Sequence, residues 1–155
     1  MRKRSKYTPR GVRLDTMDFV VTGMSKLSTR ESDYITMHLK NMSALDSLSK
    51  GLATHREIDI IIGVINVAEA LCELDVGAEY HPQVLSASSA LYDVCKRSLN
   101  RSGRFVCTGE ELSSIKLGFE IHDAQLEITT IGMLGKALDI IEKAIKAKKA
   151  KAING

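Results

Sequence analysis

The chain has 155 residues, of which 44% are hydrophobic and 26% are charged, as in an ordinary soluble globular protein. At this length we expect one domain that buries about two-thirds of its unfolded surface without disulfides or metals. No apolar run reaches the length of about 18 residues that a membrane span needs, and no apolar segment follows the basic N-terminus as in a secretory signal.

The net charge of +3 is unevenly distributed. Residues 1–13 contain six cations and no acid, and residues 136–155 contain six lysines and two acids. The remaining segment, residues 14–135, therefore carries a net charge of −7. Two basic ends flank an acidic body.

The cysteines indicate the compartment. Cys72, Cys95 and Cys107 are odd in number and lack the short spacing of a metal site. Cys72 and Cys95 fall at apolar positions of predicted helices. We interpret all three as reduced thiols, which indicates a reducing compartment such as the cytoplasm.

The first element expected is a basic arm at residues 1–13, which includes a proline and a glycine and few residues to bury. A short helix is predicted at residues 15–23, capped by an aspartate. Residues 28–50 then show apolar side chains near helical spacing, including Leu39 and Met42. Gly51 suits the position that follows a helix.

The segment of residues 54–75 is the most apolar in the chain and is expected to be the central, buried helix. Thr54 and Glu57 form a capping box, in which each side chain bonds a backbone N–H that has no partner within the helix. Gly63 costs a helix about 1 kcal/mol relative to alanine, so we expect it to mark a close helix crossing. A three-residue connection makes this helix antiparallel to the preceding one.

Three further helices complete the predicted domain. One covers residues 82–102, with Pro82 in its first turn. The next begins with the capping box of Thr108 and Glu111 and runs to about residue 128, and the last runs from Thr129 or Thr130 to about Lys149. The residues assigned to the inner faces of the first and last of these helices include Leu85, Leu99, Leu138 and Ile145.

These segments predict an all-α fold, an up-and-down bundle of four long helices plus a short N-terminal helix. The expected organisation is a basic arm at residues 1–13, a helical domain at residues 14–149 and a flexible end at residues 150–155. Gly63, Ala68 and Ala70 on the central helix also suit an interface between two copies, so a homo-oligomer is one expected partner arrangement.

Cations at several places suggest contact with phosphate groups. In the arm they are accompanied by a tyrosine that can stack on a base; the candidates are Arg2, Lys3, Arg4, Lys6, Tyr7, Arg10 and Arg13. A solubilising tail, or an arm folded back on the acidic body, also explains these charges. Arg97, Arg101 and Arg104 crowd the end of the helix at residues 82–102, where they complement the helix dipole or meet a phosphate.

The densest group of chemically active side chains lies within one predicted helix. Its candidate binding residues are Glu120, His122, Asp123 and Glu127. A di-metal site in a bundle needs Glu-x-x-His, which does not occur here. A carboxylate pocket would form if this face met Glu69 and Glu73, although the polar stripes of amphipathic helices are the simpler interpretation. We expect no metal and no cofactor.

Catalytic motifs are missing from the sequence. It contains no phosphate-binding loop, nucleophile elbow or His-Glu-x-x-His. A nucleophilic pair of His122 with Cys95 or Cys107 is conceivable in three dimensions, but no motif favours it. We therefore expect no catalytic residue and no enzyme activity.

Six segments spread along the chain share the pattern of one group of proteins. They are Lys3-Arg4-Ser5-Lys6-Tyr7-x-Pro9-Arg10-x-Val12-x-Leu14-Asp15, Leu39-Lys40-Asn41-x-x-Ala44-Leu45-Asp46, Gly51-x-Ala53-Thr54, Gly103-Arg104-Phe105, the run 120–127 and the run 149–153. The chain resembles a family of small uncharacterised proteins encoded by phages and prophages of proteobacteria. The resemblance implies action in the host bacterial cytoplasm and names no active site.

The leading hypothesis is a non-enzymatic phage-type protein that binds a host or phage protein and inhibits or redirects it. The alternative is a nucleic-acid-binding accessory protein that uses residues 2–13 and 143–151. A third reading is a nucleotide or small-ligand binder with pockets between subunits, where the arginines at 97, 101 and 104 meet phosphate.

Overall fold

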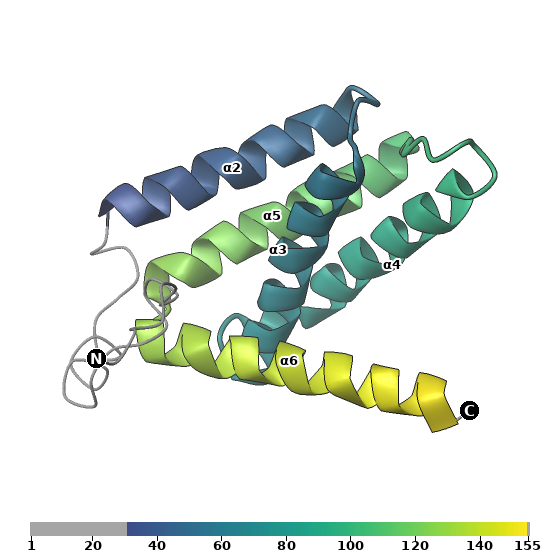
Figure 1. The fold of residues 1–155 in the computed structure, drawn as a ribbon. Coiled ribbons are helices and arrows are strands. Elements are labelled where there is room, and N and C mark those ends of the chain that lie inside the picture. The colour runs from purple at the N-terminus through teal and green to yellow at the C-terminus, as the bar shows by residue number, and fades with distance from the viewer. Residues whose placement is uncertain (1–30, 155) are drawn as a thin grey trace, which may run out of the picture.

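The computed structural model describes residues 31–154, with side-chain exposure for residues 34–148 (Figure 1). Its α-helices are α2 (Glu31–Ser49), α3 (His55–Glu73), α4 (His81–Ser98), α5 (Gly109–Ile128) and α6 (Ile131–Asn154), and the short 3-10 helix η2 (Ala78–Tyr80) precedes α4. No strand occurs among the described residues, which confirms the all-α fold. This part alone holds five long helices, one for each long helical segment predicted in chain order, so the predicted total of four long helices undercounts those segments by one. The predicted arm and short helix lie outside it.

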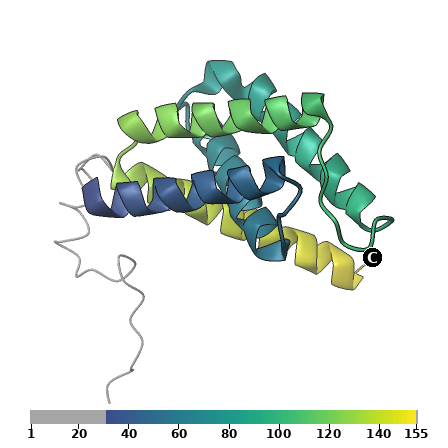
Figure 2. The same cartoon turned by 90° about the horizontal axis from the view of Figure 1, so that it is seen from above.

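Helix α3 is the centre of the fold, as its apolar sequence predicts. It packs against α2, α4, α5 and α6. Helices α4 and α5 form the most extensive helix pair. In Figure 1 and Figure 2, α6 runs across the end of α3 instead of lying alongside it. Helix α6 is therefore covered by the rest of the bundle over only part of its length.

Side-chain caps begin three of the helices. The backbone N–H of Thr54 donates to the Glu57 carboxylate over 2.9 Å, and that of Thr108 donates to Glu111 over 2.8 Å. Both predicted capping boxes are confirmed. The Thr130 hydroxyl accepts the N–H of Met133 over 3.1 Å, so α6 begins with a cap although it lacks the acidic half of a box.

Residues with positive φ follow the ends of α2, α3 and α4. Gly51 has φ +70°, as expected of the residue that follows a helix. Helix α4 ends at Ser98, four residues before the predicted end, because the N–H of Gly103 returns to the Ser98 carbonyl over 3.0 Å. Ser102 and Gly103 both have positive φ, which no helix accommodates. Helix α6 instead continues to Asn154, past the predicted end at Lys149.

The main core lies between α3, α4 and α5, with α2 covering one side. Its contact region includes Gly118, where an added Cβ would lie 2.9 Å from Ala87 Cβ and 2.7 Å from Ile65 Cδ1. The close helix crossing is therefore at Gly118. The prediction for Gly63 is wrong, because Gly63 is exposed and a Cβ there would meet nothing within 4 Å.

A second core cluster joins the end of α3 to α6. Leu71, Leu126 and Ala137 are buried in it. Leu138 and Ile145 were assigned to the inner face of α6, but they are 51% and 47% exposed. This assignment is wrong because α6 crosses α3, so a narrow face centred on Ala137 makes the contact.

Gln125 connects α5 to α3 and to the loop that follows it. Its Nε2 donates to the carbonyl oxygens of Ala68 over 3.0 Å and Val76 over 2.8 Å. Gly77, in the left-handed conformation, passes directly over this side chain: a Cβ at position 77 would lie 3.3 Å from Gln125 Cγ. One buried amide therefore holds the loop between α3 and α4.

Candidate functional site

The structure divides the predicted polar cluster of α5 between two surfaces. His122 and Asp123 face α2, whereas Glu120 lines a hollow beside Tyr80 on the other side of α5. Glu127 is exposed. Burial, and after it the charges of the Asp123 and Glu127 carboxylates, raise the pKa of Tyr34 on α2.

Asp123 lies between two histidines from different helices. One carboxylate oxygen is 3.5 Å from His38 Nδ1 and the other is 3.5 Å from His122 Nδ1. These separations suit ion pairs but exceed hydrogen-bond length, and both Nδ1 atoms are buried without a hydrogen-bond partner. Tyr34 stacks on His38, with ring centroids 6.3 Å apart. Four side chains thus join α2 to α5.

A hollow of about 280 Å³ opens between α2 and α3 next to this cluster. His122 lines it together with Asn41, and both residues are buried. Lys40 is the charged residue at its edge, and Gly63 leaves one wall without a side chain. The other lining residues are apolar: Met37, Ile60, Val64 and Val67.

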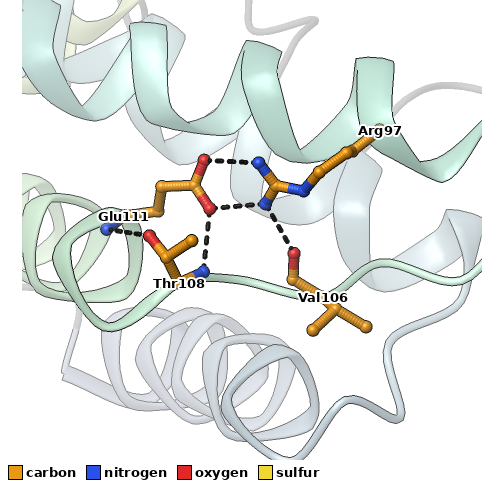
Figure 3. Close-up of polar contacts among 4 residues, drawn as sticks. All are labelled: Arg97, Val106, Thr108 and Glu111. Carbon is orange, nitrogen blue, oxygen red and sulfur yellow. Dashed lines mark hydrogen bonds and ion pairs between the residues drawn. The ribbon is translucent and has the colours of Figure 1, made fainter.

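Arg97 has a structural role, so the prediction that it meets phosphate is not supported by its surroundings. Its guanidinium binds the Glu111 carboxylate through two nitrogens, at 3.0 and 2.5 Å, and donates to the Val106 carbonyl over 2.9 Å (Figure 3). The same carboxylate accepts the Thr108 N–H of the capping box. Arg97 lowers the pKa of Glu111 to about 2. The pair joins the end of α4 to the start of α5.

Arg101 and Arg104 remain exposed on the loop after α4, around a hollow that Ser102 and Val106 also line. Among the described residues, neither arginine makes a hydrogen bond or an ion pair with another side chain. The candidate cations at positions 2–13, with Tyr7, lie outside the described part of the chain.

Three large apolar side chains form a row along the outer surface of α4, and the last of them, Leu99, belongs to the residue directly after the helix, which keeps helical φ and ψ. Leu85, Tyr92 and Leu99 are spaced seven residues apart and are 45%, 65% and 83% exposed. Residues seven apart lie almost above one another on a helix. The assignment of Leu85 and Leu99 to the inner face is therefore wrong. The buried face of α4 is formed by Val84, Leu91 and Val94 with small residues between them.

The two acidic helix faces that would form a carboxylate pocket if they met do not meet. Glu69 and Glu73 line a groove between α3 and α6, opposite Lys148, whereas Asp123 faces α2. Among the described residues, no group of three or more histidines, cysteines or acids has the geometry of a metal site.

All three cysteines are free thiols. Burial raises the pKa of each, and that of Cys107 rises to about 11. Cys107 lies just before α5 whereas His122 lies 13 residues into it, a separation of about 20 Å along the helix. This separation excludes the nucleophilic pair of Cys107 and His122.

Sequence reasoning missed two features of the candidate sites. His38 stands 85 residues from Asp123, and no local motif joins them. The α4 row follows a seven-residue repeat that is readable in the sequence, but two of its three members were assigned to the core. Their exposure depends on which face α3 and α5 cover.

Comparisons with protein-family models, with curated proteins and with solved structures found no match to this chain. Among the described residues, no helix is both long and apolar enough to cross a membrane.

Proposed function

We propose that this chain is a non-enzymatic, phage-type binding protein that captures a host or phage protein in the bacterial cytoplasm and inhibits or redirects it. The α4 row of Leu85, Tyr92 and Leu99 carries the proposal, because large apolar side chains gathered on one exposed face mark interaction surfaces. Tyrosine is also enriched among residues that dominate binding energy.

The charges beside the α4 row favour a particular kind of partner. Lys96 lies over the Tyr92 ring, with Nζ 6.0 Å from its centroid, and Arg101 and Arg104 follow Leu99. Asp93 is the acid on the same exposed side of α4. A partner helix with apolar residues at seven-residue spacing and acidic flanks would complement this surface.

Affinity capture tests the proposal. The full chain is immobilised and incubated with nuclease-treated proteobacterial lysate, in parallel with the variant Leu85→Ser/Tyr92→Ser/Leu99→Ser. A matched variant, Gln83→Ala/Ser89→Ala/Asn100→Ala, changes three exposed polar residues on or directly after α4. The wild type and the matched variant should retain the same protein partner, and the α4-row variant should lose it.

A partner retained by a folded α4-row variant would contradict the proposal, with circular dichroism reporting the fold. Nucleic-acid binding is the alternative, favoured by the exposed Arg101, Arg104 and the lysines of α6. It predicts capture that disappears after nuclease treatment and weakens steeply with salt. The hypothesis of a nucleotide-binding protein is weakened at Arg97, because the guanidinium of Arg97 is already bound to the Glu111 carboxylate.

A further inference from the structure

The hollow between α2 and α3 has the composition of a small-ligand site that is separate from the α4 row. Its volume of about 280 Å³ is near the lower end for ligand pockets. Met37, Ile60 and Val67 supply apolar walls. A Cβ added to Gly63 would meet nothing within 4 Å, so the wall that α3 contributes is open at that position.

Two buried residues with polar side chains, Asn41 and His122, line this hollow. His122 is 3% exposed, and its Nδ1 forms no hydrogen bond. Asn41 is 8% exposed, and among the described residues its amide forms no hydrogen bond. The Asn41 amide can therefore bind a polar ligand atom without giving up a hydrogen bond to the described part of the chain.

The charge at the edge of the hollow favours an anionic ligand. Lys40 is the only lysine, arginine or acid among the lining residues, and no ion pair neutralises it in the described part of the chain. Behind the hollow, the Asp123 carboxylate lies 3.5 Å from His122 Nδ1. The other ring nitrogen of His122, Nε2, can donate a hydrogen bond to an anion in the tautomer that carries its proton there. Asn41 supplies further donors.

We propose that this hollow binds a carboxylate carried on a short aliphatic stem. The carboxylate meets Lys40, Asn41 and His122, and the stem lies against Met37, Ile60 and Val67. The ligand is either a free short-chain acid or the C-terminal residue of a peptide. Asp123 acts through His122 and is a positioning residue.

Nuclear magnetic resonance of the full chain tests this site with defined probes. Hexanoate represents the free acid and N-acetyl-leucine the peptide end, whereas hexylamine and N-acetyl-leucinamide are matched probes without a carboxylate. We expect saturable shifts of the His122 ring signals with at least one carboxylate and none with the matched probes. If hexanoate binds more tightly, the ligand is a free short-chain acid; if N-acetyl-leucine binds more tightly, the ligand is the C-terminal residue of a peptide.

Variants locate the binding in the hollow. Gly63→Leu places a side chain in the open wall without a clash at its Cβ, so it should fold and abolish the saturable shifts. Lys40→Gln should weaken binding by up to about fivefold, the effect of losing one exposed charge pair. Lys50 is also an exposed lysine, but it pairs with Asp46 and does not line the hollow. The control variant Lys50→Gln should therefore leave the affinity unchanged.

Three results would overturn the proposal: no saturable His122 shift with either carboxylate, equal binding of hexylamine, or unchanged binding in a folded Gly63→Leu variant. None of these results depends on the α4 row, so this proposal and the capture of a partner protein fail or succeed separately.

Discussion

Replacing Gly118 with alanine tests the close packing of α5 against α3 and α4. The new Cβ would lie 2.9 Å from Ala87 Cβ and 2.7 Å from Ile65 Cδ1. Ala87 Cβ is attached directly to the backbone of α4 and cannot move by rotation. Relief therefore requires α4 and α5 to separate, in a core where Ala87 and Ile65 are almost fully buried.

The expected cost of Gly118→Ala follows from two opposing terms. Overpacking a core costs about 1–3 kcal/mol, and we expect the upper part of this range, about 2–3 kcal/mol, because the contact with Ala87 cannot be relieved by rotating a side chain. Exchanging glycine for alanine within a helix returns about 1 kcal/mol. We expect a net loss of about 1–2 kcal/mol in unfolding free energy, which lowers Tm by about 2–8 °C at this chain length.

Urea and thermal unfolding followed by circular dichroism measure this loss. Gly63→Ala is the matched control, because Gly63 also lies within a helix but its Cβ would meet nothing within 4 Å. The control should gain up to about 1 kcal/mol. A Gly118→Ala variant as stable as wild type, or the same sign of change at both glycines, would refute the packing argument.

Two further predictions follow from groups with displaced pKa values. The pKa of Glu111 is about 2 when folded, below its ordinary value of 4.5. Its stabilisation is therefore present above about pH 4.5 and is lost as the pH falls toward 2, so the difference in unfolding free energy between wild type and Glu111→Gln should shrink between pH 6 and pH 3. A difference that stays constant in urea titrations would count against the Arg97 pair as its cause. The Cys107 thiol, with a pKa of about 11 against an ordinary 9, should react with iodoacetamide at pH 8 up to about a hundredfold more slowly than in urea. Mass spectrometry of the alkylated chain measures the rate of this reaction. Equal rates for the folded and the urea-unfolded chain would contradict the burial of the thiol.

Local signals predicted much of the helical framework. The capping boxes at Thr54 and Thr108 locate the starts of α3 and α5, because a cap depends on residues three positions apart. The glycine at position 51 locates the end of α2 for a similar reason. The predicted end of α4 at residue 102 is wrong, because Ser102 has a positive φ, which cannot be predicted for a serine from the sequence.

The candidate sites were less predictable because they depend on contacts between helices. Asp123 was identified in the sequence, but its partner His38 comes from a helix 85 residues away. The sequence suggests that Arg97 contacts phosphate, whereas in the structure Arg97 pairs with Glu111 at the junction of α4 and α5. Periodicity alone does not say which part of an apolar face will be covered.

The sequence by itself determined that the chain is helical, where most helices begin and that α3 is central, because capping and apolar periodicity act within a few residues. Only the tertiary structure decided that α6 crosses α3, that Gly118 rather than Gly63 lies at the close crossing, and that Leu85 and Leu99 face outward. Those outcomes depend on how the helices pack, and packing joins residues that are distant in the chain.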